Sequence, residues 1–343
     1  MGYLSEKAGS DLGLPAGVAV GSGVIDAYAG WIGTVGAKAD LGDDALGDGQ
    51  ASANDVSHAF TRLAAVAGTS TCHLAVSKDA VFVDGVWGPY RDVLIPGYWM
   101  AEGGQSATGE LLRHTIETHP AYQETARKAE AEGRNIHEFL NAALRRRADE
   151  SLAPSISYLG RHLFLYGDLW GNRSPIADPG MRGAVVGLGS DRSGDDLALL
   201  YYAAMEFIAL QTRQIVETMN GAGHSIQSIF MSGSQCQNDI LMALVATACD
   251  MPVLIPEYVH AAVVHGAAML GAKAASADAN GETEPLWSIM NRMSRPATVV
   301  RPSADPGQKK LLAAKYEVFL EQCRTQQEYR RKVDDAVRGW SKA

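Results

Sequence analysis

The chain has 343 residues, of which 46% are hydrophobic and 20% are charged. This is enough chain to bury a full core, and the composition is that of an ordinary globular protein. The 30 basic and 39 acidic residues leave a formal net charge of −9, which argues against a nucleic-acid surface or a polybasic membrane patch. A polyanionic ligand would therefore have to be held by local backbone donors.

The cysteines and histidines form no paired or clustered pattern. The four cysteines lie far apart, without a C-x-x-C pair or a secretory segment before them, as is typical of a reduced intracellular protein. No apolar run approaches the ~18 residues of a membrane helix, and the nine histidines lack metal-ligand spacing. We therefore expect a cytoplasmic α/β protein without a structural metal and without a membrane or nucleic-acid partner.

The first stretch with a chemical signal is residues 17–33, which predict a short buried strand, a glycine turn and a helix. Asp26 falls in the first turn of that helix, at the carboxyl end of the strand, where ligands bind in open α/β sheets. Helix capping is the commoner role of such an aspartate. However, the neighbours of Asp26 are unusually apolar for a simple cap: Val24, Ile25, Ala27 and Tyr28.

A turn rich in glycine and hydroxyl groups separates the next two apolar strands. A surface connection at 36–52 and a short helix at 54–63 lead to the first strand, and the turn is Gly68-Thr69-Ser70-Thr71. Glycine allows a close backbone approach, the neighbouring N–H groups can point at an anion, and the hydroxyls add donors. These residues suit a phosphate cradle, although an ordinary tight hairpin has the same composition.

A β-rich meander is predicted at 80–99, and residues 102–113 form a glycine-rich entry into a helix that ends near residue 118. Small residues at Gly104, Ala107 and Gly109 would let a flat or bulky group rest on the start of this helix. Close packing of the helix on a sheet explains them equally well. The charged stretch 120–150 predicts a helical excursion on the surface.

The second half of the chain alternates strands and helices. It predicts a strand at 163–166, a loop at 167–179, a helix at 195–220, a strand, Gly/Ser turn and helix start at 226–238, a helix to 250, a strand at 253–255, a helix at 260–275 and, after residues 298–302, a last helix at 306–340. The Gly/Ser turn is Ser232-Gly233-Ser234. The last helix carries an apolar stripe: Leu312, Tyr316, Phe319 and Cys323.

Two common nucleotide motifs are missing from the sequence. It has no G-x-x-x-x-G-K-S/T loop and no G-x-G-x-x-G after a strand, which excludes a P-loop and a Rossmann site. The sequence has two phosphate-cradling turns, followed by a strand–glycine–helix unit that could carry a nucleoside. This arrangement is typical of the actin-like ATPase fold. Each turn alone is a weak signal, so the prediction depends on their order and spacing.

Five motifs in the same order resemble the FGGY carbohydrate kinases, and among them most closely the pentulose kinases of D-ribulokinase type. The motifs stand at residues 21–29, 67–71, 96–106, 171–175 and 232–238. The resemblance covers nearly the whole chain. It implies an actin-like ATPase (ribonuclease H-like) fold with a mixed sheet flanked by helices. It also implies phosphorylation of a sugar hydroxyl, with ATP and Mg²⁺ as cofactors and a small-molecule pentulose such as D-ribulose as substrate.

The resemblance also assigns roles to single residues. Asp26 matches the family's catalytic base, which takes the proton from the attacking sugar hydroxyl. Gly68, Thr69 and Ser70 match the turn that holds the ATP phosphates. Gly109 matches the glycine at the helix start near the nucleotide.

A third group of residues matches the turn on the adenosine side of the family's nucleotide site. These residues are Gly233, Ser234 and Asn238. The family usually has two consecutive glycines followed by an asparagine, whereas this chain has serine at the second position. The added hydroxymethyl group is small, so we expect the nucleotide site to tolerate it.

The resemblance further implies a division of the chain into three parts. Residues 1–58 would be the remnant of a first, sugar-side domain with the catalytic aspartate, residues 59–297 the nucleotide-binding domain, and residues 298–343 a helix that packs back towards the first domain. The family's first domain opens with an Asp-x-Gly-Thr motif, which this sequence lacks. We therefore expect the chain to correspond to a C-terminal half.

Two hypotheses follow for the function. The chain is either a sugar kinase, or a truncated or pseudo-kinase module that binds nucleotide weakly or needs a partner chain, such as a missing N-terminal half; a homodimer is also an open alternative. The second hypothesis predicts bare apolar surface where the first domain should sit. We expect that surface at residues 18–20 and at the stripe of the last helix.

Overall fold

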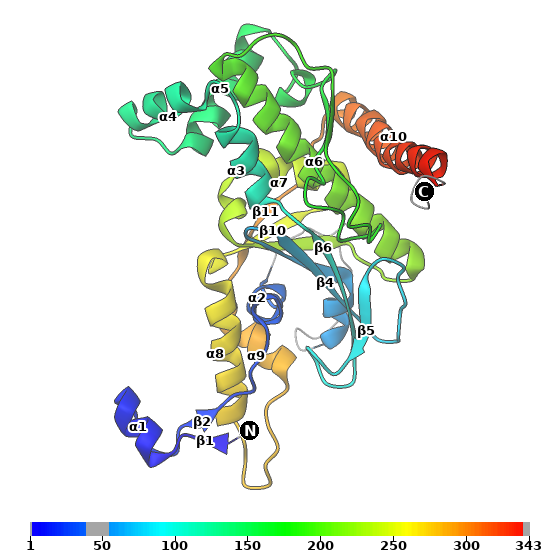
Figure 1. Ribbon diagram of the computed structural model, residues 1–343. Helices are drawn as coiled ribbons and strands as arrows, with labels where there is room; N and C mark the ends of the chain where they lie inside the picture. Colours follow the sequence, from blue (N-terminus) through cyan, green and yellow to red (C-terminus); the bar gives the residue numbers. More distant parts are fainter. Residues whose placement is uncertain (1, 39–54, 339–343) are drawn as a thin grey trace.

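The computed structural model describes residues 2–38 and 55–338, and its centre is a seven-stranded mixed sheet (Figure 1). The strand order is β11-β10-β9-β3-β4-β6-β5. The strands are β3 (Arg62–Ala67), β4 (Thr71–Ser77), β5 (Trp87–Arg91), β6 (Trp99–Gln105), β9 (Ser228–Ser232), β10 (Val253–Pro256) and β11 (Ala297–Val300). Neighbours β3, β9 and β10 run parallel, and the other neighbouring pairs are antiparallel.

Helices cover both faces of the sheet, which confirms the predicted mixed sheet flanked by helices. One face carries α3 (Gly109–Glu117), α4 (Tyr122–Ala131), α5 (Ile136–Glu150), α6 (Gly194–Ala222), α7 (Asp239–Cys249) and α10 (Pro306–Val337). The other face carries α2 (Asp26–Val35), α8 (Ala262–Ala275) and α9 (Leu286–Met293). None of the described helices is long and apolar enough to cross a bilayer.

Shorter elements complete the described fold. They are β1 (Gly2–Tyr3), α1 (Glu6–Leu12), β2 (Ala19–Val20), β7 (Phe164–Tyr166), β8 (Ala184–Val186) and the 3-10 turns η1 (Val56–Thr61), η2 (Ile156–Tyr158), η3 (Ser234–Gln237) and η4 (Val259–Ala261). The predicted helix at 54–63 is thus a 3-10 turn that ends where β3 begins. Most of the predicted surface connection at 36–52 lies outside the described residues.

The two hydrophobic cores follow from the alternation of side chains along β3. Leu63, Ala65 and Ala67 belong to the core under α6 and α7, whereas Ala64 belongs to the core under α2 and α8. Successive side chains of a strand point to opposite faces of the sheet. A strand that is buried on both faces needs apolar residues throughout, which explains the continuous apolar run of β3.

Helix α2 runs antiparallel to β3. At one end, Arg62 at the start of β3 donates a hydrogen bond to the carbonyl of Val35 at 2.8 Å. At the other end, Gly30 lies against Val66, and a Cβ atom at position 30 would stand 2.9 Å from Cγ2 of that valine. The N-terminus of α2 therefore points toward the turn that follows β3.

Two glycines let α2 approach α8 at backbone distance. A Cβ atom at Gly33 would stand 2.0 Å from the carbonyl oxygen of Ala262, and one at Gly266 would stand 1.9 Å from that of Ala29. Real Cβ atoms do not come this close to a backbone oxygen, so only glycine fits both positions. The contact fixes α2 on the sheet between β3 and α8.

The strand predicted within residues 17–23 exists but is not buried, so that part of the prediction is wrong. Strand β2 has two residues and pairs with the equally short β1. Val18 and Val20 are 41% and 45% exposed because this small hairpin lies outside the two cores. The expectation that residues 18–20 are bare is confirmed.

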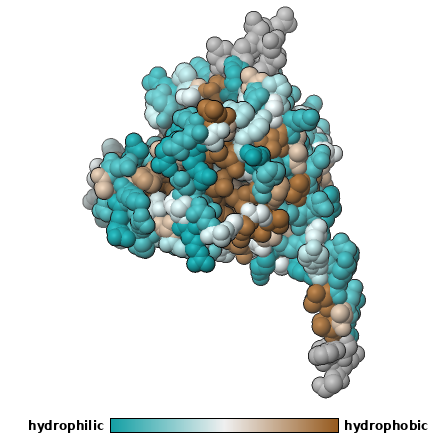
Figure 2. Space-filling model, turned by 90° about the horizontal axis from the view of Figure 1, so that it is seen from above, coloured by the Kyte–Doolittle hydropathy of each residue, from teal (hydrophilic) through white to brown (hydrophobic). Residues whose placement is uncertain are grey.

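The stripe on the last helix is buried, which corrects the expectation of a bare surface. Phe319 stacks with Tyr166 at a centroid distance of 5.5 Å and packs against Phe207 of α6 at 5.8 Å. The stripe thus completes the core of this chain itself. The bare apolar side chains lie farther along the helix, on the projecting end in Figure 2, and are Tyr329, Val333 and Val337.

The predicted glycine-rich helix entry at 102–113 is also partly wrong. Its first part belongs to β6, and α3 begins only at Gly109. The sheet register overrides the local composition there, because residues 102–105 pair with β4 through Leu74 to Thr71. The predicted domain boundary at residue 58 stays a prediction, although α2 packs within the core of the described sheet.

The packing of α2 on α8 generates a stability prediction. Gly266→Ala should lower the free energy of unfolding by about 1–3 kcal/mol, because the new methyl group meets the backbone of Ala29. Urea unfolding of the purified variants measures this. The control is Gly271→Ala in the same helix, where a Cβ atom meets nothing within 4 Å. It should raise stability by up to about 1 kcal/mol, and equal effects of the two changes would contradict the close helix contact.

Candidate functional site

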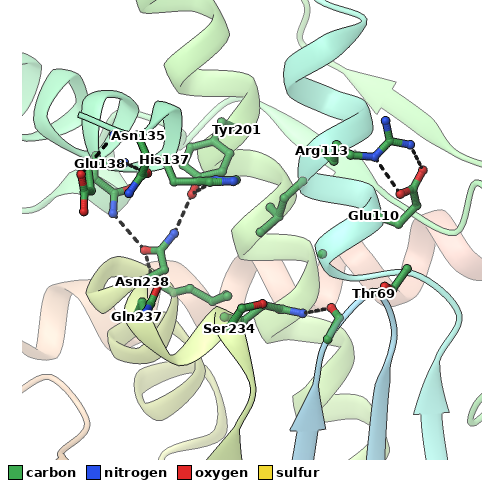
Figure 3. A pocket seen from close by; sticks show the side chains of 16 residues that line it. Thr69, Glu110, Arg113, Asn135, His137, Glu138, Tyr201, Ser234, Gln237 and Asn238 are labelled. Carbon is green, nitrogen blue, oxygen red and sulfur yellow. Dashed lines mark hydrogen bonds and ion pairs between the residues drawn. The ribbon is translucent and has the colours of Figure 1, made fainter. Parts of the chain in front are cut away.

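Three chain connections converge at one edge of the sheet and enclose a pocket of about 590 Å³ (Figure 3). The connections are the β3–β4 turn, the segment from β6 to α3 and the segment from β9 to α7. Strands β3, β6 and β9 point the same way, so their carboxyl ends meet at this edge. Five of the eight predicted site residues line the pocket: Gly68, Thr69, Gly109, Ser234 and Asn238.

The turn after β3 uses its carbonyl groups to hold α3. The Gly68 oxygen accepts hydrogen bonds from Gln235 Nε2 at 2.7 Å and from the Gly109 N–H at 3.3 Å. The Thr69 oxygen accepts from the N–H groups of Thr108 and Glu110 at 3.0 and 3.2 Å. In a trans peptide the N–H points opposite to the carbonyl. The N–H groups of Thr69 and Ser70 therefore point away from α3, and the bonds made by the carbonyls polarise them.

Glycine is required at the two positions where backbones meet behind this turn. A Cβ atom at Gly109 would stand 2.6 Å from the Gly68 oxygen. Gly233 has φ +96°, in the left-handed region, and a Cβ atom there would stand 2.0 Å from the oxygen of Ala67. Ser234, which replaces the family's second glycine, is exposed on the pocket wall. Its side chain therefore does not obstruct the packing of the turn.

Three helices begin at the pocket. They are α3, α5 with its N-cap Asn135, and α7 with its N-cap Asn238. A helix N-terminus carries roughly half a positive charge and favours an anion. These helix ends would favour an anion, although the whole chain is acidic and the carboxylates of Glu110 and Glu138 also line the pocket.

Asn238 connects the helices around the pocket. Its Oδ1 accepts from the Leu241 N–H at 3.2 Å and from Asn141 Nδ2 at 3.0 Å, and its Nδ2 donates to Tyr201 Oη at 2.6 Å. Burial raises the pKa of Tyr201, so its phenol stays neutral. The Asn238 side chain is therefore occupied in holding α5, α6 and α7 together, and its predicted contact with adenosine stays a prediction.

Asp26 lies outside the pocket but at the same edge of the sheet. It is the first residue of α2, and its Oδ1 accepts from the adjacent Ala27 N–H at 2.7 Å, while the N-cap position belongs to Ile25. Four residues of helix span about 6 Å. Since Gly30 lies at Val66, the exposed carboxylate of Asp26 lies near the turn that follows β3. The pocket and Asp26 are on opposite faces of the sheet, on either side of that turn.

A partly buried ion pair on the Asp26 side was not predicted from the sequence. Arg173 Nη2 lies 2.8 Å from Glu102 Oε1, and its guanidinium group lies 4.5 Å from the centroid of the Trp87 ring. This side chain packs against Gly104, where a Cβ atom would stand 2.7 Å from Arg173 Nε; Gly104 lies in β6 and not at the helix start where a flat group was predicted to rest. Burial and the nearby Glu102 raise the pKa of Tyr28 on α2 to about 12.

The loop that carries Arg173 is anchored by the buried Asp168. One carboxylate oxygen accepts from Gln211 Nε2 at 2.8 Å and the other from Asn172 Nδ2 at 2.7 Å. Ser106 Oγ also donates to the Gly171 carbonyl at 2.8 Å. Only the motif at 171–175 signalled this region in the sequence, since the side-chain partners of Arg173, Glu102 and Cys72, lie 71 and 101 residues away from it.

The described residues contain no group of three or more His, Cys, Asp or Glu side chains that could hold a metal ion. A divalent cation at this edge would therefore need oxygen ligands from a bound phosphate and from water. Mg²⁺ commonly binds in this way, with one or two protein ligands and several waters.

The strand order and the glycine-lined turns at the carboxyl edge define an actin-like ATPase fold. Solved structures agree: the xylulose kinase from Rhodospirillum rubrum matches with a TM-score of 0.67 and 20% identity, over 95% of this chain and 55% of that chain. A Plasmodium falciparum glycerol kinase solved with ADP matches with a TM-score of 0.58 and 14% identity, over 93% of this chain and 53% of its own. At these identities the likeness shows the fold.

The sequence comparisons go further than the fold. The C-terminal domain model of the FGGY family of carbohydrate kinases matches residues 63–275, and the chain belongs to that family. It is 53% identical to the D-ribulokinase YDR109C of Saccharomyces cerevisiae over 271 residues, which is 79% of this chain and 38% of the yeast protein. It is 40% identical to a human FGGY carbohydrate kinase domain-containing protein over 326 residues, which is 95% of this chain and 56% of the human protein. The chain thus spans about half or less of these relatives.

Strand β4 contains a buried histidine that generates a pH prediction. His73 on β4 is fully buried, and neither ring nitrogen has a hydrogen-bond partner among the described residues. Burial, helped by the charge of Arg173, lowers its pKa to about 3. Below pH 6.5, His73 therefore binds a proton in the unfolded chain but not in the folded chain. The free energy of unfolding falls as the pH drops from 6.5 toward 3.

Between pH 6.5 and 5 this single group should cost about 2 kcal/mol of the free energy of unfolding. Urea unfolding at pH 7 and pH 5 measures the loss. His73→Leu should reduce the loss by about that amount, whereas the control His162→Leu, at an exposed position, should leave it unchanged. Identical pH dependence in the wild type and His73→Leu would contradict the assignment.

Proposed function

We propose that this chain carries the nucleotide site and the catalytic base of an ATP-dependent sugar kinase. One observation carries the proposal: the Gly68–Ser70 turn lies between a pocket suited to a polyanion and the carboxylate of Asp26. A phosphoryl group held at the turn would have its donor on one face of the sheet and its acceptor on the other. Phosphoryl transfer needs mainly such positioning, with one carboxylate to orient the nucleophile.

The pocket residues fit ATP. The close backbone contacts at Gly109 and Gly233 leave a turn whose N–H groups can bind phosphate oxygens, and three helix N-termini add a favourable field. The part of the pocket near Asn135 and Tyr201 would take the nucleoside. When bound, ATP supplies the phosphoryl group, and Mg²⁺ would enter with its phosphates.

Asp26 would act as the general base. Its exposed carboxylate would accept the proton of the sugar hydroxyl as that oxygen attacks phosphorus. Glu102, which is paired with Arg173, also interacts with Tyr28, the second residue after Asp26 on α2, so the ion pair lies on the same side of the sheet as Asp26. For the acceptor we propose a pentulose such as D-ribulose, supported by the 53% identity to a yeast D-ribulokinase.

A second candidate function is a module that needs further protein for catalysis. Apolar side chains are exposed on the N-terminal hairpin and beside Asp26, at Val18, Val20 and Ile25, with 41%, 45% and 53% exposure. The projecting end of α10 adds Val333 at 62% exposure (Figure 2). Bare apolar surface marks an interface. In this alternative, the chain binds nucleotide alone, and a partner supplies the groups that hold the sugar.

The first prediction of the proposal concerns nucleotide binding. Gly233→Ala should weaken ADP binding at least about tenfold, because the methyl group meets the Ala67 backbone and the turn must move. Isothermal titration calorimetry measures the affinity, and the melting temperature checks the fold. Gly221→Ala, where a Cβ atom meets nothing within 4 Å, should bind ADP like the wild type. Unchanged binding by a folded Gly233→Ala protein would contradict the site.

The second prediction tests the sugar kinase directly. With ATP, Mg²⁺ and D-ribulose, a coupled assay should detect sugar-dependent ADP release, and Asp26→Asn should lower kcat by roughly 10²- to 10⁴-fold. The matched control is Asp11→Asn, at an exposed position of α1, with unchanged rates. Equal rates for wild type and Asp26→Asn would contradict the role of Asp26. Nucleotide binding without any turnover would favour the module that needs a partner.

A further inference from the structure

The nucleotide pocket contains a buried hydrogen-bond acceptor without a donor. Asn141 of α5 lines the pocket and is only 6% exposed. Its Oδ1 has no hydrogen-bond partner among the described residues. Buried polar atoms are nearly always paired, so an orphaned one inside a pocket indicates where a ligand supplies the missing group.

The orientation of this amide is fixed by its neighbours. The backbone N–H of Leu241 can only donate, so the atom of Asn238 that it meets must be the oxygen. That oxygen also faces Asn141 at 3.0 Å, so Asn141 must present its NH₂ group there. The carbonyl oxygen of Asn141 is thus left as the atom without a partner, and a flip of the amide would place two oxygens against each other.

Asn141 lies at the end of the pocket away from the phosphate turn. Figure 3 shows Thr69 at one side, and the group Asn135, His137, Tyr201 and Asn238 at the other. With phosphates at the turn, the base of a nucleotide reaches this second group. The leucines Leu112 and Leu241 line the pocket as well and offer apolar contact to a flat ring.

We propose that Asn141 is a specificity-determining residue that selects adenine through its 6-amino group, an inference that rests on the proposed nucleotide site. The amino group donates a hydrogen bond to Asn141 Oδ1. Inosine triphosphate carries an oxo group at the same ring position, so two acceptors would face each other. A site built to accept a hydrogen bond rejects a ligand that cannot donate one.

The test compares ATP and inosine triphosphate by calorimetry on the purified chain with Mg²⁺. The wild type should bind ATP at least about tenfold more tightly than inosine triphosphate. Asn141→Leu removes the acceptor and should bind both with similar affinity, and Asn141→Ala serves if the leucine variant does not fold. The control Gln123→Leu changes an exposed amide of α4 that does not line the pocket, and should keep the wild-type preference.

Each outcome decides the matter. A preference that disappears only in the Asn141 variants supports the inference. Equal binding of both nucleotides by the wild type, or a preference that survives in Asn141→Leu, overturns it and leaves the proposed function standing. No binding of either nucleotide overturns the proposed function and the inference together.

Discussion

The whole site depends on backbone contact at the carboxyl edge of the sheet, where the turn Gly68–Ser70 meets Gly109 on one side and Gln235 on the other. In these contacts the carbonyl groups of the turn accept hydrogen bonds, so its N–H groups point away from α3. In an acidic chain with a net charge of −9, such fixed dipoles favour a polyanion locally. A side chain at Gly109 would push α3 away from the turn, and a side chain at Gly233 would push the β9–α7 segment away from β3. In each case the Cβ atom would collide with a backbone oxygen.

The second constraint is the approach of α2 to the sheet and to α8. Gly33 and Gly266 allow the two helices to touch, and the Arg62 bond to Val35 sets the direction of α2. Asp26 lies near the turn after β3 because the helix runs antiparallel to that strand. The pocket and the carboxylate of Asp26 therefore belong to one packed unit. They lie on opposite faces of the sheet, and the turn after β3 lies between them.

Much of this was predictable from the sequence, for physical reasons. The strands of the sheet and the long helix α6 show strong hydrophobic periodicity, and the glycine turns allow few alternatives. The ion pair of Arg173 with Glu102 was not predictable, because it joins segments 71 residues apart through a loop anchored on Asp168. The buried stripe around Phe319 was misjudged because periodicity identifies an apolar face but not its partner. The orphaned oxygen of Asn141 depends on a three-residue hydrogen-bond network that no local pattern reveals.

The central claim is that a nucleotide binds at the turn after β3 and at the start of α7. Hydrogen–deuterium exchange of the chain with and without ADP and Mg²⁺ tests it most directly, because it reports on backbone N–H groups. The account predicts slower exchange in peptides that cover residues 68–71 and 233–241, with no change in α9, which lies on the other face of the sheet. Protection confined to other segments, or no protection at saturating ADP, would contradict it.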